Sequence, residues 1–173
     1  MMTKTRVTAA VTGLLLVLTA CGGGGDDEKA SQAISDSIMK EQKTAGSTDV
    51  FQMKQEEADC IGDGFVNEIG TDKLKEYGFL TKDLKTADKL TDVKMSTEDA
   101  RSAANTLFDC ADVQKMMTDS MGDLDPKTKA CLQKVMTEDA LRDLFTKMFS
   151  GKQDEAGQDL IAPMMKCTTG AQQ

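Results

Sequence analysis

Apolar residues recur along this chain with the spacing of amphipathic helices. A helix places residues i, i+3, i+4 and i+7 on one face, so apolar residues at those positions indicate a face that packs against a neighbour. Three segments show the pattern, through Leu141, Leu144, Phe145 and Met148, through Ala100, Ala103, Ala104, Leu107, Phe108 and Ala111, and through Ala156, Leu160, Met164 and Cys167. No segment alternates apolar and polar residues between turns as a strand does. The pattern predicts an all-α fold.

Residues that favour helix ends mark where several of these helices begin. Asp125 followed by Pro126 fits an N-cap and a first helical residue. Further candidate caps, each before an acid-rich first turn, are Thr71, Ser96 or Thr97, and Thr137. We expect Pro163 to bend the last helix near its end. Segment 81–95 has weaker periodicity and is predicted to be an inserted loop.

The chain begins with an apolar run that is too short to cross a membrane. Lys4 and Arg6 precede Val7–Ala20, whereas a spanning helix needs about 20 apolar residues. A charged start, a short apolar stretch and small residues at its end are typical of a secretory signal peptide, here residues 1–20. Its last residues, Leu18-Thr19-Ala20-Cys21, resemble the lipobox of bacterial lipoproteins. The resemblance implies that the thiol of Cys21 receives a diacylglycerol, with acyl chains such as palmitate, and that the signal is cut before this residue. The lipid would hold the chain at the extracytoplasmic face of the cell membrane.

Four glycines and three acidic residues follow this cysteine, at positions 22–28. Glycine adds no side chain that would stiffen the backbone, and the acidic residues keep the segment solvated. The sequence therefore predicts a flexible tether over residues 21–30. A phosphate-binding glycine loop is disfavoured, because no strand precedes the glycines and no Lys-Ser or Lys-Thr pair follows them.

Internal similarity predicts that the chain contains the same helical unit twice. One unit is predicted over 31–110 and the other over 111–167, followed by a C-terminal tail at 168–173. The matching segments are "EEADCI" at 56–61 with "KTKACL" at 127–132, and "GTDKLKEYGF" at 70–79 with "MTEDALRDLF" at 136–145. In each unit the last helix ends at or near a cysteine. We therefore expect a disulfide-clasped helical bundle of two similar units that share one core.

Four cysteines remain after Cys21, namely Cys60, Cys110, Cys131 and Cys167. An even number in an exported chain favours two disulfides, and the absence of a Cys-x-x-Cys pair argues against zinc. Four cysteines allow three pairings. Local closure within each unit favours Cys60–Cys110 with Cys131–Cys167, although the two other pairings also respect a repeated layout.

The segments "DCIGDGFVNEIGTDKLKEYGFL" and "STEDARSAANTLFDC" resemble a group of uncharacterised actinobacterial lipoproteins and secreted proteins with the same paired cysteine pattern. The resemblance covers about residues 31–167. It implies the duplicated helical architecture, and it transfers no activity.

Charge and composition exclude several classes of function. The net charge is −8, and removal of residues 1–20 would leave a mature chain at −10. This sign is wrong for nucleic acid, which proteins bind through clustered Lys and Arg. The chain has no histidine, which excludes histidine-dependent triads and removes the commonest transition-metal ligand. We expect no cofactor and no metal site.

Motifs that would carry chemistry are weak. Ser37 and Lys40 match Ser-x-x-Lys, but the further motifs of the enzymes that use it are missing, so a surface helix is favoured. Segment 119–125, "DSMGDLD", is a calcium candidate whose spacing does not fit the helix-loop-helix pattern. The acidic pairs at 56–57, 98–99 and 154–155 lie where helix starts favour negative charge. No catalytic residue is predicted.

Methionines crowd the second unit and offer one functional hypothesis. They are expected to fill an aliphatic core, but a methionine-lined groove can also bind varied apolar partners. The groove candidates are Met116, Met117, Met121 and Met164. We therefore expect a non-enzymatic binding module that contacts an envelope protein or a small apolar ligand. The alternatives are a small carboxylate-dependent hydrolase or wall-modifying enzyme, and a purely structural spacer.

Overall fold

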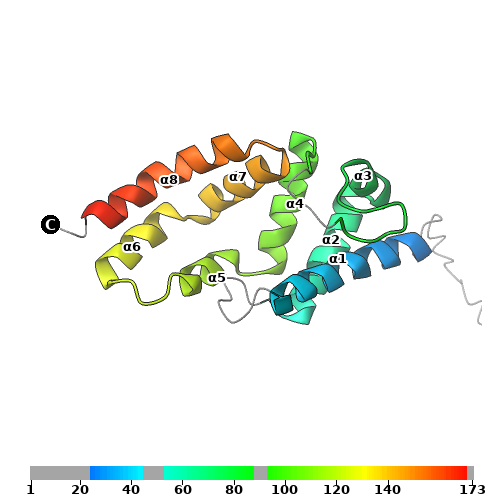
Figure 1. The fold of residues 1–173 in the computed structure, drawn as a ribbon, viewed down its shortest axis with the longest axis horizontal. Coiled ribbons are helices and arrows are strands. Elements are labelled where there is room, and N and C mark those ends of the chain that lie inside the picture. Colours follow the sequence, from blue (N-terminus) through cyan, green and yellow to red (C-terminus); the bar gives the residue numbers. More distant parts are fainter. Residues whose placement is uncertain (1–23, 45–52, 88–92, 171–173) are drawn as a thin grey trace, which may run out of the picture.

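The computed structural model describes residues 24–44, 53–87 and 93–170, and most of these residues are helical (Figure 1). The helices are α1 (Gly24–Thr44), α2 (Gln55–Ile69), α3 (Thr71–Glu76), α4 (Thr97–Cys110), α5 (Val113–Ser120), α6 (Pro126–Val135), α7 (Glu138–Phe149) and α8 (Gln153–Gly170). Extended backbone in these ranges forms one isolated bridge, between Leu80 and Thr86. The predicted all-α fold is confirmed. None of the described helices combines the length and apolar character needed to cross a membrane.

Helix α2 is central to the first unit, because α1 packs along one side of it and α4 along another (Figure 1). The buried apolar residues of this unit are Ala30, Ile34, Ile61, Phe65, Val66, Ile69, Leu74, Phe79, Leu80, Val93, Met95, Ala100 and Ala103. Segment 81–95 is non-helical where it is described, as predicted. It is more than a surface insertion, however, since Val93 and Met95 are buried in this cluster.

Two glycines inside α2 allow its neighbours to approach closely. A Cβ added at Gly62 would overlap the carbonyl oxygen of Ser31 on α1, and a Cβ at Gly64 would overlap the methyl group of Thr106 on α4. Glycine lowers helix stability by about 1 kcal/mol relative to alanine, so glycines in a helix interior need a packing reason. Here the reason is that both faces of α2 lie directly against another helix.

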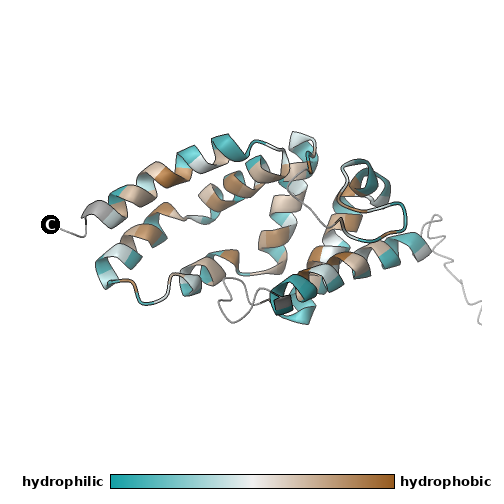
Figure 2. Ribbon diagram, viewed as in Figure 1, coloured by the Kyte–Doolittle hydropathy of each residue, from teal (hydrophilic) through white to brown (hydrophobic). Residues whose placement is uncertain are grey.

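The second unit is built around α7 and α8. Helix α8 packs against α6 and α7, and α7 also packs against α4 of the first unit. The buried cluster contains Leu132, Met136, Leu141 and Cys167, with partly buried residues Phe108, Met117, Met121, Cys131, Val135, Leu144, Leu160 and Met164 around it. Figure 2 shows that α8 begins with hydrophilic turns and becomes hydrophobic farther along.

The expectation of one shared core is wrong in detail, because the buried residues form two clusters. The clusters are joined by a row of phenylalanine rings, whose neighbouring centroids lie 5.5 to 6.2 Å apart in the order Phe79, Phe65, Phe149, Phe145, Phe108. Phe149 of the second unit packs against the first cluster, and Phe108 of the first unit packs against the second. Each unit thus packs one aromatic side chain against the core cluster of the other unit.

Both disulfides have the favoured pairing, Cys60–Cys110 and Cys131–Cys167. In each predicted unit the bond joins the second helix to the fourth, α2 to α4 and α6 to α8. The repeat is less regular elsewhere. Helix α1 packs extensively on α2, whereas α5 is not packed along α6 and contacts the end of that helix through a hydrogen bond from Gln114 Nε2 to the carbonyl oxygen of Met136 (3.0 Å).

Most predicted helix starts are confirmed. The side chains of Ser96, Asp125 and Thr137 accept backbone hydrogen bonds at the starts of α4, α6 and α7. Thr71 is an exception, because Gly70 occupies the cap position of α3. The hydroxyl of Thr71 instead donates to Asp27 Oδ1 at 2.6 Å, which ties α3 to the start of α1. A tertiary contact therefore takes the place of a local cap.

The predicted boundaries at the two ends need correction. Residues 24–30 of the expected flexible tether are the first turns of α1, and Ala30 is fully buried. The residues of α1 that follow Ala30 pack against α2. This tertiary packing stabilises the helix, so that it extends back into the glycine- and acid-rich segment at its start. At the other end, α8 continues past Pro163 to Gly170, so the expected tail at 168–173 begins inside a helix.

Candidate functional site

An apolar hollow lies on the surface between α6 and α8. It has a volume of about 260 Å³ and is lined by Leu132 of α6 and by Ile161, Met164, Met165 and Thr168 of α8. Among the described residues, Ile161 and Met165 have the most exposed large apolar side chains, at 54% and 59%. The two residues lie at helical spacing i, i+4, so they share one exposed face of α8. This is the described surface best suited to bind an apolar group.

Of the four predicted groove residues, only Met164 lines this hollow. Met117 and Met121 pack against the second core cluster, and Met116 is half-buried on α5. The residues that complete the hollow, Ile161 and Met165, fall on the outward face of the last helix. The hollow thus lies in the methionine-rich unit and includes one of the four predicted groove methionines, while Met117 and Met121 contribute to core packing.

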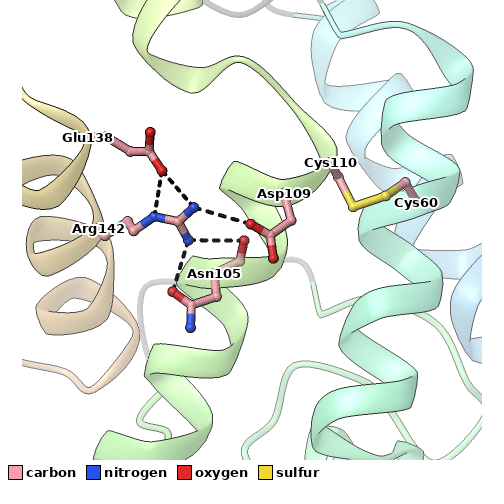
Figure 3. A network of polar contacts seen from close by, with 6 residues as sticks. All are labelled: Cys60, Asn105, Asp109, Cys110, Glu138 and Arg142. Carbon is pink, nitrogen blue, oxygen red and sulfur yellow. Dashed lines mark hydrogen bonds and ion pairs between the residues drawn. A yellow bond between two sulfur atoms is a disulfide. The ribbon is translucent and has the colours of Figure 1, made fainter.

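A second feature is the C-terminal end of α4, which is held from two sides (Figure 3). On one side the Cys60–Cys110 disulfide ties it to α2. On the other side Arg142 of α7 donates to Asn105 Oδ1 at 2.9 Å and to Asp109 Oδ1 at 3.2 Å. The same guanidinium donates to Glu138 at 2.8 Å. The end of α4 is thus the joint between the two units.

Arg142 also lies over an aromatic ring, because its Cζ atom is 4.8 Å from the centre of Phe108. A guanidinium over a ring face adds a cation–π attraction of about 0.5–1 kcal/mol or more. The paired carboxylates are well exposed, at 71% for Asp109 and 57% for Glu138, so the ion pairs themselves contribute little. Most of the stabilisation at this joint comes from the stacked and amide contacts.

Two polar hollows flank the Cys60–Cys110 disulfide. The larger, about 620 Å³, lies along α2 and α4 and is lined by both cysteines. The smaller, about 480 Å³, is lined by Cys110 at the turn into α5. Cys60 is exposed, whereas Cys167 of the other disulfide is 4% exposed within the second core. The two disulfides therefore differ in their access to solvent.

Asp99 is a buried carboxylate at the start of α4, 5% exposed. It accepts hydrogen bonds from the Tyr77 hydroxyl at 2.6 Å, from Lys73 Nζ at 3.1 Å and from the Ser96 hydroxyl at 3.0 Å. These donors, with the Tyr77 hydroxyl first, hold the pKa of Asp99 below its ordinary value against the opposing effect of burial. Each of these donors stabilises the ionised form of Asp99, and together they connect α3 to the start of α4 within the first unit.

The weaker sequence candidates have structural roles or remain on the surface. Ser37 and Lys40 lie on α1 beside a polar hollow of about 310 Å³. In segment 119–125, Asp119 pairs with Lys115 and Asp125 caps α6. Within residues 24–44, 53–87 and 93–170, no three or more His, Cys, Asp or Glu side chains are grouped to hold a metal ion. Cys21 and the predicted signal peptide lie outside the described residues.

No family model, curated protein or solved structure matches this chain.

Three features of these sites were missed by sequence reasoning. Arg142 was not singled out, although an arginine four residues after Glu138 on a helix suggests an ion pair. Asp99 was interpreted only as a first-turn acid, and nothing in its neighbourhood in the sequence signals Tyr77. The glycines of "CIGDGF" inside a helical segment did carry a signal, since glycine in a helix interior often marks close packing.

Proposed function

We propose that this protein is a membrane-anchored extracytoplasmic lipoprotein that acts as a non-enzymatic interaction module. The lipobox-like segment that ends at Cys21 supports the anchor and the location. Two disulfides within the folded part agree with an oxidising compartment outside the cytoplasm. The observation that carries the interaction role is the apolar hollow with its exposed Ile161 and Met165.

The size of the hollow favours a protein partner over an enclosed small ligand. Pockets that bury most of a small molecule have volumes of about 300–1,000 Å³. The hollow is smaller, at about 260 Å³, and it lies on an exposed helix face. It is suited to accept one or two apolar side chains that project from the surface of another envelope protein.

The charges of the two helices that form the hollow indicate the character of this partner. Helix α6 contains Lys127, Lys129 and Lys134 and no acidic residue. Beyond Leu160, Lys166 is the one charged residue of α8. The charged residues of these two stretches are thus all basic, although the chain as a whole carries −8. We therefore expect the partner to place acidic residues around its apolar side chains.

Three described carboxylates, Asp59, Asp99 and Asp125, have the opposite character to the general acid of a carboxylate-dependent hydrolase. A general acid needs a carboxyl group whose pKa is raised. The pKa values of Asp59, Asp99 and Asp125 are lowered instead, first by hydrogen bonds from Ser35, Tyr77 and Thr128, respectively. These three groups stabilise helix packing or helix ends.

Site-directed photo-crosslinking in the native cell envelope tests the proposal. A photoreactive residue is placed at Met165, and the matched control carries it at Met148, which is 42% exposed on α7 and does not line the hollow. We expect one discrete crosslinked protein from position 165 and none from 148. The additional change Ile161→Glu should remove the product while the circular dichroism of the purified chain is unchanged.

Three results would contradict the proposal. Crosslinking only to lipid would replace the protein partner by an apolar ligand, and equal products from both positions would make the hollow irrelevant. No product from either position would favour the structural-spacer alternative. The anchor is tested separately, by mass spectrometry of the mature N-terminus, where an unmodified Cys21 would refute lipidation.

A further inference from the structure

We propose that the Cys60–Cys110 disulfide is a thiol-exchange site open to small neutral or cationic thiols, while Cys131–Cys167 is a permanent structural bond. This inference is independent of the apolar hollow. It rests on the different surroundings of two disulfides in the same folded chain.

Access decides which disulfide reacts. Exchange requires a thiolate to approach one sulfur in line with the bond, so a buried disulfide is protected. Cys60 is exposed on α2, and the hollow of about 620 Å³ beside it is lined by both cysteines of the bond. Cys110 and Cys131 are both half-buried and pack against the first and the second core cluster, respectively, whereas Cys167 is 4% exposed within the second cluster. A small thiol therefore reaches Cys60 without unfolding of the protein.

The exchange step is a simple displacement. The thiolate of a small thiol attacks Cys60 Sγ, the bond between the two Sγ atoms breaks, and Cys110 leaves as a thiolate that takes a proton from solvent. The product is a mixed disulfide on Cys60 and a free thiol on Cys110. A second molecule of the thiol then attacks the sulfur that the first molecule contributed to the mixed disulfide. This step forms the oxidised small disulfide and leaves Cys60 reduced.

The charge around the bond selects the thiol. Asp63, Glu68 and Asp109 line the larger hollow, and Asp109, Asp112 and Glu138 line the smaller one. Neither lining contains a lysine or an arginine, and the nearby Arg142 offsets only part of this negative charge through its pairs with Asp109 and Glu138. A cationic thiol is therefore concentrated at the site and an anionic thiol is repelled, and salt weakens both effects.

The fold keeps its form when this bond opens. Arg142 holds Asn105 and Asp109 on the last turns of α4, and it does so from α7, independently of the disulfide. The close contact of Gly64 with Thr106 also keeps α2 against α4. The exchanged form is thus a folded protein that carries a group on α2, and the bond re-forms when Cys110 displaces that group.

The test uses the full chain under native conditions with cysteamine as the cationic thiol and 2-mercaptoethanesulfonate as the anionic thiol. Samples are quenched with acid and alkylated, and peptide mass spectrometry then measures each disulfide. We expect Cys60–Cys110 to react at least about tenfold faster than Cys131–Cys167, with the mixed disulfide on Cys60. In denaturant the two bonds should react at similar rates.

The charge preference has its own control. Each rate is divided by the rate at which the same thiol reacts with a neutral small disulfide. This division removes the difference in intrinsic reactivity between the two thiols. The normalised exchange rate of cysteamine should then exceed that of 2-mercaptoethanesulfonate by about tenfold at low salt. Glu68→Gln should reduce this ratio of rates, while Glu155→Gln on α8 should leave it unchanged. Equal rates at the two protein disulfides, an adduct on Cys110 alone, or a normalised ratio of one would overturn the proposal.

Discussion

Replacement of Gly64 by alanine tests whether close helix packing determines the residue at this position. The added Cβ would overlap the Thr106 methyl group, while Oγ1 and Cβ of Thr106 would lie at 3.3 and 3.4 Å. Overpacking of this kind costs about 1–3 kcal/mol, and the change from glycine to alanine in a helix returns about 1 kcal/mol. We expect Gly64→Ala to lower the free energy of unfolding by about 0–2 kcal/mol.

The informative measurement is the same substitution in a Thr106→Ala background. There the overlapping methyl group is gone and the remaining Cβ lies at ordinary contact distance, so the effect of Gly64→Ala should change sign and become stabilising by about 1 kcal/mol. Gly25→Ala is a matched control, because a Cβ at that position meets no atom within 4 Å. Urea unfolding followed by far-ultraviolet circular dichroism, with both disulfides intact, gives all the free energies.

Gly62→Ala gives a second contrast. The group that an added Cβ would meet there is the backbone carbonyl of Ser31, whose carbon atom would lie at 3.1 Å. A carbonyl cannot rotate away as a side chain does, so α1 would have to move, and the cost should reach or exceed the upper end of the 1–3 kcal/mol range.

If Gly64→Ala destabilises the protein equally with and without Thr106, close approach to α4 does not explain the glycine at position 64.

Further predictions concern the polar contacts and the anchor. Tyr77→Phe removes the shortest hydrogen bond to Asp99 and should cost about 1.5–3 kcal/mol at neutral pH, by urea unfolding. Because the pKa of Asp99 is lowered in the folded state, its contribution is present above its ordinary value of 3.8 and is lost as the pH falls through the folded value. The difference in free energy of unfolding between the wild-type chain and Asp99→Asn should therefore become smaller in acid. A difference that does not change with pH would refute this account. Arg142→Lys should cost about 1–2 kcal/mol because lysine loses the stacking on Phe108 and the forked contacts, whereas Glu138→Gln should cost less than about 1 kcal/mol. Cys21→Ser should move the protein from the membrane fraction to the soluble fraction, and continued membrane association would contradict the lipid anchor.

The sequence predicts well those features that depend on local pattern. Period and caps were sufficient for α4, α6 and α7, and the cysteine spacing led to the correct disulfides. These features arise within one helix or one unit, so neighbouring residues carry the information. The predicted tether was wrong at residues 24–30, because these first turns of α1 are stabilised by contacts with α2 and α3, which a local pattern does not contain.

The candidate sites were harder to predict because they depend on which helix faces meet. Met117, Met121 and Met164 all pack against the second core cluster, yet of these three only Met164 also lines the apolar hollow. Likewise, Cys60 and Cys131 occupy matching places in the repeat, but Cys60 lines a polar hollow of about 620 Å³, whereas Cys131 packs against the second core cluster. Repetition in the sequence therefore did not give equivalent surroundings.

The network around Asp99 has a practical consequence for spectroscopy. The chain contains one tyrosine and no tryptophan, so its near-ultraviolet emission arises essentially from Tyr77. That phenol donates to a buried carboxylate, which is a known type of quenching partner, and the contact joins the end of α3 to the start of α4 within the first unit. The protein thus contains its own optical reporter for the packing of this unit.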